Sequence, residues 1–63
     1  MPKVDTYIKI LKCPKGHMPC KGFWDDKEGQ FIITVHGTPR ADENEARLDA
    51  GVWAYAEGLE FKA

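Results

Sequence analysis

The sequence contains no serine, only two cysteines and no long apolar run. Without serine, the commonest hydroxyl nucleophile of enzymes is missing. No stretch approaches the roughly 18 apolar residues that a membrane span requires, so we predict that the chain does not enter a membrane. The first ten residues, MPKVDTYIKI, lack the apolar segment of a secretory signal, which favours a cytoplasmic protein.

Other catalytic arrangements are also poorly represented. The glycines do not have the spacing of a phosphate-binding loop. A chain of 63 residues leaves little room for a pocket of ordinary ligand size. A cysteine paired with a histidine is the remaining candidate for an activated nucleophile, but no orienting carboxylate is evident. We therefore predict that the protein is not an enzyme.

Residues 1–63 make a single small domain, with 43% hydrophobic and 30% charged residues. A chain this short buries only about 60% of the surface that it exposes when unfolded. Small domains therefore often add a metal, a disulfide or an oligomer interface. The net charge of −1 conceals a basic first third, with five lysines against one acid in residues 1–24, and an acidic C-terminal part. Such a molecule can meet partners of either sign.

Three segments have the pattern of strands. Residues 4–12, VDTYIKILK, alternate between two faces. Residues 21–25, KGFWD, and 30–36, QFIITVH, are rich in aromatic and β-branched side chains. Between them DKEG is a good hairpin turn, with Gly29 free to adopt a left-handed conformation.

The register of these strands decides which side chains share a face. We expect a bulge at Gly29, because it collects the apolar side chains best. One face then holds Phe23, Phe31, Ile33 and Val35, joined by Ile8 and Ile10. The opposite face holds Tyr7, Leu11, Trp24, Ile32, Thr34 and His36.

The second half of the chain is predicted to be helical. Asp42 and Glu45 form a capping box, and Gly58 fits a C-terminal cap. The apolar positions that recur at helical spacing are Leu48, Val52, Tyr55, Ala56 and Leu59, which predicts that they face the sheet. Gly51 is expected where the helix approaches the sheet closely. The tail LEFKA either forms a short fourth strand or packs Phe61 against the helix.

The sequence thus predicts an α+β fold of the βββα type. A three-stranded antiparallel meander packs on one C-terminal helix, with room for a short fourth strand. One helix covers only one face of such a sheet, so the other face is left open.

The segment 12–22, KCPKGHMPCKG, is open to three interpretations. Cys13, His17 and Cys20, with His36 as a fourth ligand, have residue types that bind structural zinc, although the common Cys-x2-Cys pair is absent. Cys13 and Cys20 flank a six-residue connection that a disulfide could close. The third interpretation is a plain connecting loop shaped by its glycine and prolines.

The open sheet face is the first candidate for function. Its aromatic side chains match the residues enriched at protein interfaces. Trp53 is expected to be half exposed, and the acids of the helix suit a basic groove on a partner. The predicted partner-binding residues are Tyr7, Lys9, Trp24, Ile32, Trp53, Glu43 and Asp49.

From these residues we predict a protein-binding or inhibitory module. Its size and charge layout are typical of phage or mobile-element proteins that block a host nucleic-acid enzyme or a defence complex. A homodimer that buries the same face fits the sequence equally well.

Nucleic-acid binding is the alternative. Lys9, Lys12, Lys15 and Lys21 lie on or beside the first hairpin, where lysines for phosphates and aromatics for stacking are combined. Residues 29–46, GQFIITVHGTPRADENEA, follow the strand-then-helix layout, and in outline the architecture resembles the integrase arm-binding and plant AP2-type DNA-binding domains. That resemblance implies a sheet that enters the major groove. The arginines and tryptophans of those strands are mostly lysines here, and a zinc at the Cys-His segment could support such a domain.

Overall fold

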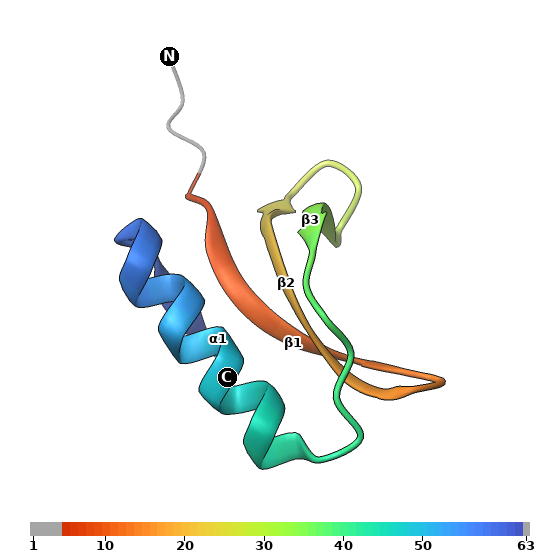
Figure 1. Ribbon diagram of the computed structural model, residues 1–63. Coiled ribbons are helices and arrows are strands. Elements are labelled where there is room, and N and C mark those ends of the chain that lie inside the picture. Colours follow the sequence, from red (N-terminus) through yellow and green to blue (C-terminus); the bar gives the residue numbers. More distant parts are fainter. Residues whose placement is uncertain (1–4, 63) are drawn as a thin grey trace.

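A computed structural model describes residues 5–62, which form a four-stranded sheet and one helix (Figure 1). The elements are β1 (Tyr7–Cys13), β2 (Gly16–Asp25), β3 (Gln30–His36), α1 (Glu43–Glu57) and β4 (Glu60–Lys62). The strand order is β3-β2-β1-β4, with β1, β2 and β3 antiparallel and β4 parallel to β1. The predicted α+β fold is confirmed, and the tail forms the short fourth strand.

Val4, which the sequence places in the first strand, lies outside the described residues. Within residues 5–62, the helix is too short and too polar to cross a bilayer.

The segment 12–22 is the hairpin between β1 and β2, not a long connecting loop. Cys13 pairs with Gly16, so only Pro14 and Lys15 form the turn. Pro19 lies inside β2, where a missing N–H normally disrupts a sheet. Its carbonyl oxygen accepts a hydrogen bond from the N–H of Gly37 at 2.7 Å. The proline nitrogen lies on this same edge of β2, beyond the end of β3, so no ladder bond is lost.

The turn between β2 and β3 corrects the predicted register. Asp25 pairs with Gln30 across four turn residues, and Gly29 has the left-handed conformation, φ 65°. Trp24 therefore pairs with Phe31, and Phe23 pairs with Ile32. The expected grouping of Phe31 and Ile33 with Phe23 is wrong, because the bulge lies at Lys21/Gly22 rather than at Gly29.

The predicted ends of α1 are confirmed in part. The Asp42 side chain accepts a hydrogen bond from the N–H of Asn44, and Gly58 is left-handed with its N–H directed to Ala54 and Tyr55. Glu45, expected to complete the capping box, instead has its carboxylate 3.6 Å from Arg40.

The helix packs on the sheet with a different face from the one predicted. Ala46, Ala50 and Ala54 are buried, and Ala50 and Ala54 form the core with Ile8. Partly buried side chains surround that core: Ile10, Trp53, Leu59 and Phe61. Alanine lets the helix axis approach the sheet closely, which larger side chains would prevent.

Of the predicted face, only Leu59 packs against the core. Leu48, Val52, Tyr55 and Ala56 are exposed. Gly51 also lies away from the sheet, since a Cβ built there meets no atom within 4 Å. The prediction that the helix approaches the sheet closely at Gly51 is therefore wrong. The helix α1 is rotated so that its alanines, rather than Gly51, face the sheet.

The helix covers only part of the sheet. In the described residues α1 lies against β1, β2 and β4 but not against β3. Figure 1 shows β3 at the edge of the sheet farthest from α1. After β3 the chain runs along β2, where Arg40 and His17 exchange two backbone hydrogen bonds of 2.7 Å, and this fixes where α1 begins.

Candidate functional site

The face of the sheet opposite α1 carries a group of aromatic and lysine side chains. Side chains of directly paired residues lie on the same face of a sheet. The pairing of Tyr7 with Gly22, of Gly22 with Ile33 and of Trp24 with Phe31 therefore gathers them together. We call this surface the open sheet face, and its members are Tyr7, Lys9, Trp24, Phe31, Ile33 and Lys62.

The aromatic rings of this face contact one another and two ammonium groups. The ring centroids of Tyr7 and Phe31 lie 5.2 Å apart with an interplanar angle of 43°. Lys9 Nζ lies 5.7 Å from the Phe31 centroid, and Lys62 Nζ lies 4.5 Å from the Tyr7 centroid. Gly22 makes room for this arrangement, because a Cβ there would collide with the Phe31 ring and the Ile32 carbonyl.

Trp24 is the accessible aromatic residue of the open sheet face. Its exposed fraction is 50%, whereas Tyr7 is 8% exposed beneath Phe31 and Lys62. Tyr7, Lys9 and Trp24 are thus brought together as the sequence predicted, and Phe31 is a member that the sequence reasoning placed on the other face. Ile32 was predicted here but pairs with Phe23 on the helix side.

A second apolar surface lies on the outer side of α1. Leu48, Val52 and Tyr55 have exposed fractions of 69%, 63% and 89%. We call these three residues the outer helix stripe. The sequence identified them as one helical face but assigned that face to the core.

A groove of about 540 Å³ separates the outer helix stripe from β3. Val35 and His36 form its wall on the β3 side, and Leu48, Val52 and Trp53 form the wall on α1. The rest of its lining consists of Pro19, Gly37, Thr38, Arg40 and Asp49. Trp53 packs close to Gly37, where an added Cβ would lie 3.1 Å from the indole.

The charged residues predicted on the helix are engaged within the chain. Glu43 lies 3.4 Å from Arg47, and Asp49 accepts a hydrogen bond from Arg40 Nε at 2.7 Å. The hydrogen bond that Arg40 donates to Asp49 is the main reason why the pKa of Arg40 is raised. Asp49, which lines the groove, and Glu43, which does not, are therefore ion-paired rather than free negative charges.

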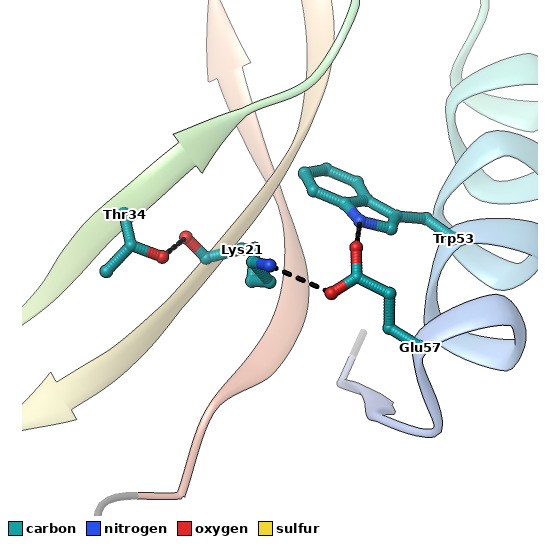
Figure 2. A network of polar contacts seen from close by, with 4 residues as sticks. All are labelled: Lys21, Thr34, Trp53 and Glu57. Atoms are coloured by element: carbon teal, nitrogen blue, oxygen red, sulfur yellow. Dashed lines mark hydrogen bonds and ion pairs between the residues drawn. The ribbon is translucent and has the colours of Figure 1, made fainter.

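Glu57 joins the helix to the sheet (Figure 2). Its carboxylate accepts hydrogen bonds from Lys21 Nζ, at 2.8 Å, and from the Trp53 indole N–H. The hydrogen bond from Lys21, followed by that from Trp53, lowers the pKa of Glu57. Thr34, the extra residue of the bulge, donates its hydroxyl to the Lys21 carbonyl at 3.0 Å.

The four candidate metal ligands do not converge. Cys13 and Cys20 lie on the open side of the sheet, whereas His17, one residue out of phase, lies on the helix side. His36 pairs with Cys20, but residues 5–62 contain no group of three or more His, Cys, Asp or Glu side chains placed to hold a metal ion.

The two cysteines are free thiols in the structure. Cys13 pairs with Gly16 and Cys20 with Lys9, so the two are not opposite one another as a cross-strand disulfide requires. Cys20 is fully buried, and this burial is the main cause of its raised pKa.

The four candidate nucleic-acid lysines are distributed over different surfaces. Lys9 belongs to the open sheet face, Lys15 lies in the hairpin turn, and Lys21 is paired with Glu57. Lys12 and His17 line a hollow of about 360 Å³ beside Glu43 and Arg47, on the helix side. The lysines therefore do not form one continuous basic track.

Comparisons with protein-family models, with curated proteins and with solved structures found no match to this chain.

Proposed function

We propose that the chain is a non-enzymatic protein-binding module whose contact surface is the open sheet face, centred on Trp24. The observation that carries this proposal is the half-exposed indole of Trp24, held beside a packed aromatic pair on a face that α1 does not cover. Tryptophan in such a setting is typical of residues that dominate binding energy at protein interfaces.

The surroundings of Trp24 define the chemistry of the partner. Lys9 and Lys62 place two positive charges on the same face. A protein segment that presents an apolar side chain to Trp24 and carboxylates to the lysines would be complementary in shape and charge. An inhibitory role requires nothing more than such binding, and it stays a prediction from size and charge layout.

Selection from a library of random peptides tests this proposal. Peptides of random sequence selected on the immobilised protein are expected to combine an aromatic or aliphatic residue with acids. Trp24→Ala should weaken their binding roughly 30-fold or more, in line with an interface anchor. Lys27→Ala, a turn lysine outside this face, is the matched control and should change little. Selected peptides that bind Trp24→Ala as tightly as the parent would refute the proposal.

Nucleic-acid binding remains a second candidate because Lys9 and Lys62 share the face of Trp24. Against it, the ring faces of Phe31 and Tyr7 are already occupied by those ammonium groups, which leaves Trp24 as the accessible stacking platform. Titration with a fluorescent oligothymidine at two salt concentrations separates the candidates. Tight binding that weakens steeply with salt would favour nucleic acid.

A further inference from the structure

Helix α1 is apolar on two opposite sides. Ala46, Ala50 and Ala54 pack on the chain's own sheet. At about 100° per residue, the outer helix stripe lies on the opposite side of the helix. A helix that covers one sheet is normally polar on its solvent side. Two opposite apolar sides are instead expected of a helix that lies between two layers.

The sheet offers a bare strip beside α1. The helix packs on β1, β2 and β4 and leaves β3 uncovered in the described residues. β3 lies two strand spacings, roughly 10 Å, from β1. Neighbouring helices pack at roughly the same separation. The strip next to α1 is therefore about one helix wide, and Phe23, Ile32 and Val35 are its helix-side residues.

The charges at the groove favour a neutral, apolar occupant. Arg40 is paired with both Asp49 and Glu45, at 2.7 and 3.6 Å. No charged side chain lies between Gln30 and His36 on β3. The apolar walls of Val35, Leu48 and Val52 require apolar side chains in return.

From these features we infer that the chain forms a two-fold symmetric dimer in which the outer helix stripe of each copy lies in the groove of the other. One chain supplies both complementary parts, a bare helix stripe and a bare strip of sheet one helix wide. Two-fold symmetry makes the contact reciprocal, so both pairs of surfaces are buried at once. The product is a sandwich with two helices between two sheets.

This arrangement goes beyond the proposed function and uses different residues. The open sheet faces lie on the outer sides of the sandwich, so both copies of Trp24 stay accessible. A dimer of this form would present two identical partner-binding surfaces, which raises avidity for a repeated or dimeric partner.

Sedimentation equilibrium of the purified chain over a wide concentration range tests the dimer. The expected species has twice the 7.1 kDa mass of the chain. Val52→Glu should raise the dimer dissociation constant about 100-fold or more, because it places an unpaired carboxylate in the interface. Arg47→Gln, on the flank of α1 away from the groove, is the matched control and should leave association unchanged. A chain that stays monomeric at millimolar concentration would overturn the inference, as would a dimer insensitive to Val52→Glu.

A measurement on the unmodified sequence covers the case in which Val52→Glu fails to fold. In a mixture of isotope-labelled and unlabelled protein, intermolecular NOEs are expected between the Tyr55 ring and the Val35 methyl groups. Tyr55 does not line its own chain's groove, so this contact reports the partner copy. A dimer whose intermolecular NOEs lie on other surfaces would contradict the proposed interface.

The Trp24→Ala variant separates the two proposals. It should dimerise as tightly as the parent chain even where peptide binding is lost. Loss of dimerisation in this variant, with the fold intact, would place the self-contact on the open sheet face and overturn the inferred groove interface.

Discussion

Lys21 on β2 and Glu57 in the last turn of α1 form an ion pair, with Nζ and Oε1 2.8 Å apart. The same carboxylate accepts a hydrogen bond from the indole N–H of Trp53 (Figure 2). The Trp53 ring packs near Gly37. Glu57 thereby links the end of the helix to the central strand at the edge of the groove.

The link predicts a pH-dependent contribution to stability. The pKa of Glu57 is lowered in the folded chain, first by Lys21 and then by Trp53. A carboxyl group of this kind stabilises the fold above its unfolded pKa, and that stability is lost as the pH falls through the folded pKa. Thermal unfolding should show Glu57→Gln to be less stable than the parent at about pH 7. The difference should shrink as the pH falls below the ordinary range of glutamate and vanish once Glu57 is protonated in both states.

High salt provides an independent check on this prediction. Both side chains are partly exposed, so salt should screen their attraction and reduce the effect of Glu57→Gln at neutral pH. A difference between the two proteins that is constant from neutral to strongly acid pH would contradict a charged role for Glu57.

The local features of the fold could be predicted from the sequence because their causes are local. The Asp42 cap, the left-handed Gly58 and the turn at Gly29 depend on a few neighbouring residues. The alternation of β1 placed Tyr7 and Lys9 on one face for the same reason. These elements were predicted correctly.

The rotation of α1 could not be predicted because two helical faces are apolar. Leu48 and Val52 are more hydrophobic than alanine, and Tyr55 adds a large aromatic ring at the same helical spacing, so these residues were assigned to the core. The structure selects the alanine face because the chain pairs along β2 before the helix, and small side chains permit close packing. That choice depends on tertiary geometry, which the periodicity of the sequence does not contain.

Phe31 was missed at the candidate site for a related reason. The four-residue turn pairs Trp24 with Phe31, so these two side chains share a face. A bulge at Gly29 would instead have placed Phe31 on the face of Phe23. The actual bulge at Lys21/Gly22 then returns Val35 to the side of Phe23. Turn length and bulge position shift register by one residue, and the apolar residues on both faces of β3 leave either register acceptable.

The rotation of α1 is itself testable by adding volume to alanines. Ala50 is fully buried against Ile8, so Ala50→Leu should destabilise the fold by about 1–3 kcal/mol through overpacking. The control is the same substitution at Ala56, which is exposed and lies outside the buried alanine face of α1. It should change stability by less than about 0.5 kcal/mol. Chemical denaturation of dilute protein measures both. A larger effect at Ala56 would indicate that the helix faces the sheet as the sequence first suggested.

Gly51 predicts a stabilising substitution. It lies in the middle of α1, and a Cβ there meets no atom within 4 Å. Because glycine is about 1 kcal/mol less favourable than alanine inside a helix, Gly51→Ala should raise the free energy of unfolding by about that amount. The control is Gly22→Ala, where the new Cβ would collide with the Ile32 carbonyl and the Phe31 ring, and stability should fall. If Gly51→Ala were destabilising, the outward orientation of Gly51 would be wrong.

The two thiols should differ sharply in reactivity. Cys20 is fully buried with a raised pKa, and its thiol lies 3.5 Å from the Met18 carbonyl oxygen. Cys13 is partly accessible next to the hairpin turn. Because the thiolate is the reacting species, Cys20 should react with a disulfide reagent at least about tenfold more slowly than Cys13. The variants Cys13→Ala and Cys20→Ala, each with one thiol, assign the two rates. Denaturant should make the rates similar, since only the fold protects Cys20. Equal rates in the native protein would contradict the burial of Cys20.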